Sequence, residues 1–154
     1  MWTSMDQDSH FMRIALGLAE QARDMGEVPV GSVVVIDGKV AGEGCNSPIT
    51  LSDPTAHAEI LAMRAAAAGT GNYRLIGATV YCTVEPCLMC LGAMLHSRIS
   101  RLVYGVADPK VGAVGKLAEL MAGGAEFNHR FETVSGVLAE EASAQLKEFF
   151  KERR

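Results

Sequence analysis

The sequence predicts an α/β fold, a three-layer α/β/α sandwich built around a mixed sheet of mostly five strands. A helical pattern comes first, a β-hairpin follows it, and strands then alternate with helices to the end of the chain. Such alternation is typical of a sheet that helices cover on both faces. The chain has 154 residues without an internal repeat or linker, so we expect a single domain over residues 1–154.

Five segments have the apolar spacing or the composition of a helix. These helices are expected over residues 9–25, 56–68, 87–96, 116–121 and 138–150. Ser9 or Asp8 is suited to cap the first helix and Thr55 the second, because their side-chain oxygens accept hydrogen bonds from free backbone N–H groups. Pro86 fits the first turn of the third helix, where the missing N–H has no helical partner.

Five shorter segments, rich in β-branched or other apolar residues, predict strands. They cover residues 30–36, 39–45, 78–84, 101–105 and 133–136. Asp37 and Gly38 stand between the first two strands and are a strong signal for a tight hairpin turn. The segment 46–53 contains Pro48 and is expected to form a polar loop.

The composition is that of an ordinary folded domain. Hydrophobic residues make up 49% of the chain and charged residues 21%, which excludes a disordered protein. No stretch approaches the roughly 20 apolar residues of a membrane span, and residues 1–10 do not resemble an export signal. We therefore expect a cytoplasmic protein whose four cysteines are thiols. The net charge is −4, yet residues 60–116 carry six basic residues against two acidic ones, which could contact phosphates.

Two short groups of residues, each at the start of a predicted helix, carry the chemistry. His57 and Glu59 form the first group, and Cys87 and Cys90 form the second. Two cysteines three positions apart share one helix face, and with one imidazole they leave the fourth position of a tetrahedral zinc ion open, as catalytic sites do. We expect one Zn²⁺ per subunit, held by His57, Cys87 and Cys90, which lowers the pKa of a bound water. Glu59, two residues from a ligand, is the candidate general acid and base.

With several wider matches, these residues resemble the cytidine deaminase superfamily, and within it the tRNA adenosine deaminases. The matching segments are 27–31, Asn46 with Pro48, 53–57, 72–74, 96–98 and 128–130. The resemblance extends over residues 11–150. It implies the cytidine deaminase-like fold and hydrolytic deamination of adenosine to inosine at the wobble position, in the anticodon stem-loop of tRNA. Zinc-activated water and a glutamate proton shuttle are the known means of that chemistry.

The same resemblance implies which residues hold the substrate. Asn46 would read the base edge, Val28 and Pro29 would form the apolar wall of the base pocket, and Asp108 would face the ribose and phosphate groups of flanking nucleotides. Apart from the resemblance, the aromatic side chain of Phe149 in the last predicted helix could stack on a splayed base, with Phe150 as the neighbouring candidate. Each of these residues also has a purely structural interpretation, as a turn, cap or core residue.

The predicted helix over residues 87–96 is apolar on nearly all sides, while only one face can turn toward the zinc and the sheet. We therefore expect a homodimer that covers the other face, as the resemblance also implies. Three alternative functions remain open. The zinc site could serve a deaminase of a free base or nucleoside of the guanine or cytosine type. It could stabilise a non-catalytic RNA-binding module, although Glu59 would then have no role, or the cysteine pair could belong to a thiol oxidoreductase.

Overall fold

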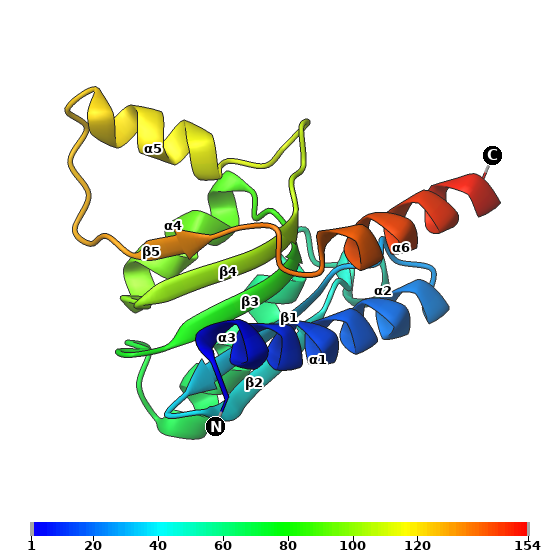
Figure 1. Ribbon diagram of the computed structural model, residues 1–154, viewed down its shortest axis with the longest axis horizontal. Helices are drawn as coiled ribbons and strands as arrows, with labels where there is room; N and C mark the ends of the chain where they lie inside the picture. Colours follow the sequence, from blue (N-terminus) through cyan, green and yellow to red (C-terminus); the bar gives the residue numbers. More distant parts are fainter. Residues whose placement is uncertain (1, 154) are drawn as a thin grey trace.

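A computed structural model describes residues 2–153, so Met1 and Arg154, the two ends of the predicted domain, lie outside the described residues. The chain forms three layers, with a single five-stranded sheet between two layers of helices (Figure 1). This arrangement confirms the predicted α/β/α sandwich. Within residues 2–153, none of the helices combines the length and the apolar character that crossing a lipid bilayer requires.

The sheet is mixed, with the strand order β2-β1-β3-β4-β5. Its strands are β1 (Gly31–Ile36), β2 (Lys39–Cys45), β3 (Thr79–Val84), β4 (Arg101–Val106) and β5 (Glu132–Val134). Strand β1 runs antiparallel to both β2 and β3, whereas β4 is parallel to β3 and to β5. Asp37 and Gly38 form the predicted hairpin turn with φ values of 51° and 74°, and two positive φ angles in sequence are what a tight type I′ turn requires.

Helices cover both faces of the sheet. The elements α1 (Ser4–Asp24) and α6 (Ala139–Glu152) lie on one face, α3 (Ala58–Thr70), α4 (Leu88–Ser97) and α5 (Val114–Ala122) lie on the other, and the short α2 (Pro48–Leu51) follows β2 (Figure 1). Alternate residues of one strand pack on opposite faces of the sheet. Val34 packs into the core under α3 and α4, and Val33 packs into the core under α1. This alternation follows from the two-residue period of a strand.

The first helix begins earlier than predicted. Thr3 caps α1 in place of Ser9 or Asp8, which lie inside the helix. The Thr3 hydroxyl accepts a hydrogen bond from the Asp6 N–H (3.1 Å), and the Asp6 carboxylate accepts one from the Thr3 N–H (3.0 Å). This reciprocal capping box satisfies two free N–H groups at once, whereas one side chain at residue 8 or 9 would satisfy one.

The two helices that carry the chemistry begin later than predicted. His57 and not Thr55 is the N-cap residue of α3, because the Thr55 hydroxyl donates to the Asp53 carboxylate (2.7 Å) in a turn before the helix. Cys87 is the N-cap residue of α4, so Pro86 precedes the helix and is not part of its first turn. The loop predicted over residues 46–53 contains the one-turn helix α2, which Pro48 begins.

Candidate metal centre and substrate pocket

Most of the predicted functional residues meet at one edge of the sheet, where β3 and β4 end. Because β1 is antiparallel to β3, its first residue lies at this edge, and the Gly31 N–H donates to the Thr83 hydroxyl (3.2 Å). Gly31 also pairs with Cys45, the last residue of β2. The segments that follow β2, precede β1 and follow β3 are thus brought together by the sheet register. They contain Asn46 and Cys87 among the predicted residues.

His57, Cys87 and Cys90 converge into a three-donor cluster. His57 Nδ1 lies 3.6 Å from each Sγ atom, and the two Sγ atoms are 3.8 Å apart. A tetrahedral ion with Zn–S bonds of about 2.3 Å and Zn–N bonds of about 2.1 Å separates two sulfurs by about 3.8 Å and sulfur from nitrogen by about 3.6 Å. The donors therefore fit a tetrahedral zinc ion, with the fourth vertex free for a ligand that the protein does not supply.

Helix starts position these donors. His57 and Cys87 each occupy an N-cap position with an extended backbone, and neither side chain makes a capping hydrogen bond. Their side chains are thus free to act as ligands, and the positive end of the helix dipole favours thiolate at Cys87. Hydrogen bonds with Cys90 and His57 lower the pKa of Cys87 to about 4. The hydrogen bond with Cys87 and burial raise the pKa of Cys90.

Glu59 lies in the first turn of α3, and its side chain is buried, with 4% of the residue exposed. Burial raises the pKa of its carboxyl group, and this outweighs the hydrogen bonds from its own backbone N–H and from Cys90 and the charge of His57, which lower it. No lysine or arginine among residues 2–153 forms an ion pair with it. Cys82 is fully buried on β3, and burial together with the nearby Glu59 raises the pKa of its thiol, which keeps it protonated.

Asn46 follows β2 and is tied to the segment that precedes β1. Its backbone N–H donates to the Val30 carbonyl (3.0 Å), and its side-chain Nδ2 donates to the Val28 carbonyl (3.3 Å). In the described part of the chain no hydrogen bond uses its amide oxygen. The side chain is therefore oriented by the backbone and keeps an acceptor for a ligand.

A cavity of about 440 Å³ opens at this edge of the sheet. Its walls are the segment before β1, the last residue of β3, the loop after β4 and two side chains of α6, and its lining includes Val28, Asp108 and Phe150. Pro29 is buried, so Val28 is the member of the predicted pair that faces the cavity. Asp108 Oδ1 also accepts hydrogen bonds from the N–H groups of Lys110 (2.9 Å) and its neighbour Val111 (3.2 Å), so it caps the turn as well as lining the cavity.

Phe149 does not line this cavity. It is 3% exposed, and the Arg153 guanidinium lies 3.8 Å from the centre of its ring, whereas Phe150 is 51% exposed and lines the cavity. The expectation that Phe149 stacks on a base is therefore corrected, and Phe150 is the accessible aromatic residue of α6. Adjacent helix positions face directions about 100° apart, and the apolar pattern alone does not say which of two neighbouring phenylalanines turns inward.

Glu27 supports this region, although no pattern in the sequence predicts a role for it. Glu27 is buried, and its carboxylate accepts hydrogen bonds from the Ile49 N–H (3.3 Å) and from the Thr50 N–H and hydroxyl (2.7 Å each). It thereby holds α2 next to Asn46. Although burial raises the pKa of Glu27, these hydrogen bonds lower it further and keep the group ionised. The only sequence signal was its place in the matched segment 27–31.

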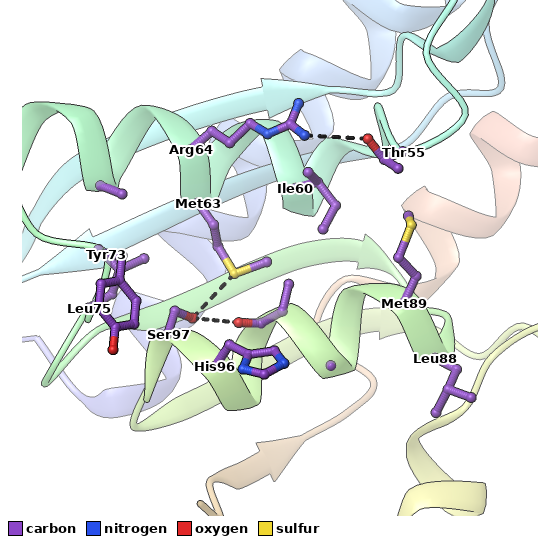
Figure 2. A pocket seen from close by; sticks show the side chains of 13 residues that line it. Thr55, Ile60, Met63, Arg64, Tyr73, Leu75, Leu88, Met89, His96 and Ser97 are labelled. Carbon is purple, nitrogen blue, oxygen red and sulfur yellow. Dashed lines mark hydrogen bonds between the residues drawn. The ribbon is translucent and has the colours of Figure 1, made fainter. Parts of the chain in front are cut away.

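A second cavity, of about 590 Å³, lies on the outer side of the molecule between α3 and α4, and none of the three zinc donors lines it. Figure 2 shows Ile60 and Met63 of α3 facing α4, where Ser97 donates to Met63 Sδ (3.6 Å). Leu88 and Met89 complete one end of the groove and are exposed. The groove is thus mostly apolar and open.

The part of the chain that contains the metal centre is similar to a family of known zinc-binding proteins. Residues 5–106 match a family described as the cytidine and deoxycytidylate deaminase zinc-binding region. That span contains the three donors and Glu59. The chain belongs to this deaminase family. Its three-donor cluster is accordingly the zinc site of a deaminase, as predicted.

Individual relatives indicate which group of deaminases this chain is similar to. It is 52% identical over 148 residues to the tRNA-specific adenosine deaminase of Haemophilus influenzae. The matched region covers 96% of this chain and 85% of the relative. It is 42% identical, with a TM-score of 0.84, to a structure solved in a study of A-to-I editing by tRNA:A34 deaminases, over 89% of this chain and 99% of the other. The guanine deaminase of Bacillus subtilis is 39% identical with a TM-score of 0.62, over 64% of this chain and 63% of the other. The chain therefore belongs with the tRNA-specific adenosine deaminases.

Proposed function

We propose that this deaminase converts adenosine to inosine at the wobble position of tRNA anticodons, with one Zn²⁺ per subunit. The observation that carries the chemistry is the placement of a buried carboxylate, Glu59, in the first turn of the helix whose N-cap residue is the donor His57. The two tRNA-editing relatives support the choice of substrate, because they match this chain over 89% or more of its length.

The chain's own part in the reaction is proton transfer. When bound, Zn²⁺ polarises a water molecule and lowers its pKa toward neutrality. The Glu59 carboxylate accepts a proton from the attacking water and donates it to N1 of the purine, beside the carbon under attack. Glu59 then takes the remaining proton of the hydroxyl group now bonded to C6 and delivers it to the amino group. The C6–N bond breaks, the C6 carbonyl forms, and the amino group leaves as ammonia. One carboxylate serves both transfers because they occur in sequence, so one adenosine and one water give one inosine and one ammonia.

Residues that line the cavity, together with Asn46, whose side chain is hydrogen-bonded to the lining residue Val28, support recognition of a nucleotide in RNA. The free amide oxygen of Asn46 can accept a hydrogen bond from a base edge, and Val28 offers an apolar wall. Phe150 offers an exposed aromatic face for stacking. The Asp108 carboxylate can accept a hydrogen bond from a ribose 2′-hydroxyl, which DNA lacks. These contacts favour an RNA substrate in the cytoplasm, where the thiols of the zinc site stay reduced.

We also propose that a second copy of the chain covers the groove between α3 and α4. The apolar, exposed side chains of Leu88, Met89 and Tyr73 at this groove support an interface between subunits. Sedimentation at micromolar concentration is expected to show a dimer, and Ala93→Glu, which places a charge in the groove, is expected to yield monomers. A monomeric wild-type protein with full activity would contradict this part of the proposal.

The substrate assignment is tested by measuring ammonia release from four substrates in parallel. We expect rapid release from an anticodon stem-loop with adenosine at the wobble position, inosine at that position on sequencing, and slow release from free adenosine, cytidine and guanine. Preference for guanine would instead support the function of the Bacillus subtilis relative. Binding of the stem-loop without turnover would support an RNA-binding module, and purified protein without zinc would support a thiol oxidoreductase.

A further inference from the structure

The loop between β4 and α5, residues 107–113, forms one wall of the 440 Å³ cavity through residues 107–111. A single side chain joins the two ends of this loop. Glu85 Oε1 accepts a hydrogen bond from the Asp108 N–H (3.1 Å), and Glu85 Oε2 accepts one from the Val114 N–H (3.1 Å). These bonds satisfy backbone donors at the start of the loop and at the start of α5.

Glu85 is itself fixed in place by the sheet and lies two residues before the metal donor Cys87. Its N–H donates to the Val106 carbonyl (2.8 Å), at the ends of the parallel strands β3 and β4. The next residue, Pro86, accepts a hydrogen bond from the Ala113 N–H (3.0 Å). The two residues that precede the zinc donor Cys87 therefore attach the loop to the start of α4.

The loop backbone packs directly against the Glu85 carboxyl group. A Cβ atom added at Gly112 would overlap that carboxyl group and approach the Asp108 carbonyl oxygen to 2.5 Å. The position therefore requires glycine because of space, not because of its backbone angles. Glu85 thus holds the backbone of Asp108, while the Asp108 carboxylate accepts the Lys110 N–H (2.9 Å) and lines the cavity.

We propose that Glu85 is a positioning residue that holds the 107–113 loop in the shape that recognises nucleotides flanking the target adenosine. This inference rests on the proposed function. Glu85 contacts backbone N–H groups of the loop and takes no part in proton transfer, which Glu59 carries out from α3. A carboxylate suits this role because both of its oxygens accept hydrogen bonds, whereas an amide offers one acceptor.

The first test is Glu85→Gln, with an anticodon stem-loop as substrate. The amide nitrogen faces one of the two N–H groups, so one backbone donor loses its partner and the loop is held less firmly. We expect the KM for the stem-loop to rise about tenfold while kcat stays near the wild-type value and zinc remains at one per chain. Hydrogen exchange of the Asp108 and Val114 N–H groups, followed by NMR, should become faster.

A second variant disturbs the same contact without changing Glu85. Gly112→Ala forces the loop away from the carboxyl group and should raise KM as Glu85→Gln does. Gly115→Ala is the matched control, since a Cβ atom there meets nothing within 4 Å, and its KM should equal that of the wild type. The inference would be overturned if Glu85→Gln and Gly112→Ala both left KM unchanged, or if they lowered kcat without changing KM. A wild-type enzyme inactive on the stem-loop would instead overturn the proposed function, and hydrogen exchange would still decide whether Glu85 holds the loop.

Discussion

Two buried carboxylates on opposite faces of the sheet have opposite properties. Asp8 of α1 and Glu59 of α3 are each 4% exposed. Asp8 accepts two hydrogen bonds from Arg101 (2.8 and 2.6 Å) and one from the Tyr81 hydroxyl (2.7 Å). Burial raises the pKa of Asp8, but the partners outweigh it and bring the pKa below its ordinary value. At Glu59 burial prevails and the pKa is raised.

The difference shows that burial alone does not decide the role of a carboxylate. With a cation and a hydroxyl fixed beside it, Asp8 joins α1 to β3 and β4 and stays ionised. Within residues 2–153 Glu59 has no such cation beside it, and burial raises the pKa of its carboxyl group, which favours uptake of a proton as the first step of proton transfer requires. Removing each carboxylate should therefore affect different properties: activity at Glu59, and stability at Asp8.

The largest effect is expected for Glu59→Gln. The amide keeps the shape of the side chain but cannot carry protons, so turnover of the stem-loop should fall about 100- to 10,000-fold. Zinc content, measured by elemental analysis, should stay at one per chain, and the thermal midpoint should equal or exceed that of the wild type because a buried amide needs less desolvation than a carboxylate. A variant that turns over at a near-normal rate would rule out Glu59 as the proton shuttle.

Asp8→Asn should show the reverse pattern. Loss of the charge leaves Arg101 without its partner, and breaking a largely buried ion pair costs about 3 kcal/mol of unfolding free energy. For a chain of this length we expect the thermal midpoint to fall by about 10 °C. The kcat measured well below that midpoint should be unchanged. A loss of kcat in folded Asp8→Asn would contradict the separation of the two roles.

The comparison also predicts a difference in acid sensitivity. Because the folded-state pKa of Asp8 is lowered, its contribution to stability is complete above the ordinary pKa of about 3.9 and is lost as the pH falls through the lowered value. The unfolding free energy of the wild type should thus fall more steeply than that of Asp8→Asn between about pH 5 and pH 2. Urea unfolding at several pH values measures this difference, and parallel curves would show that the ion pair contributes no pH dependence.

The smallest effect is expected for Thr3→Ala, which removes the cap of the helix that carries Asp8. Loss of the capping hydrogen bond should lower the unfolding free energy by about 1 kcal/mol. Activity should not change, since α1 lies on the face of the sheet away from α3 and α4 (Figure 1). Ser9→Ala is the matched control, because Ser9 lies inside α1 and should have almost no effect.

The sequence by itself determined the sandwich and the pair of cysteine donors, because both depend on local spacing, whereas the fold brings His57 to the pair from 30 residues away. Alternation of strands and helices indicates the layers, and cysteines three positions apart at a helix start share one face whatever surrounds them. The tertiary structure decided which partners the polar side chains bind and which aromatic side chain lines the cavity. Asp8 was expected as a cap and forms an ion pair with a residue 93 positions away, and Phe150 rather than Phe149 lines the cavity.

Glu85 illustrates the reason for this division. Its position two residues before Cys87 is visible in the sequence, but its partners at Asp108 and Val114 are brought to it by the parallel pairing of β3 with β4. A carboxylate binds whichever donors the fold places within about 3 Å, and no periodic pattern records that distance. The periodic spacing of buried residues can be identified in the sequence, whereas contacts between distant polar groups form only when the sheet brings them together.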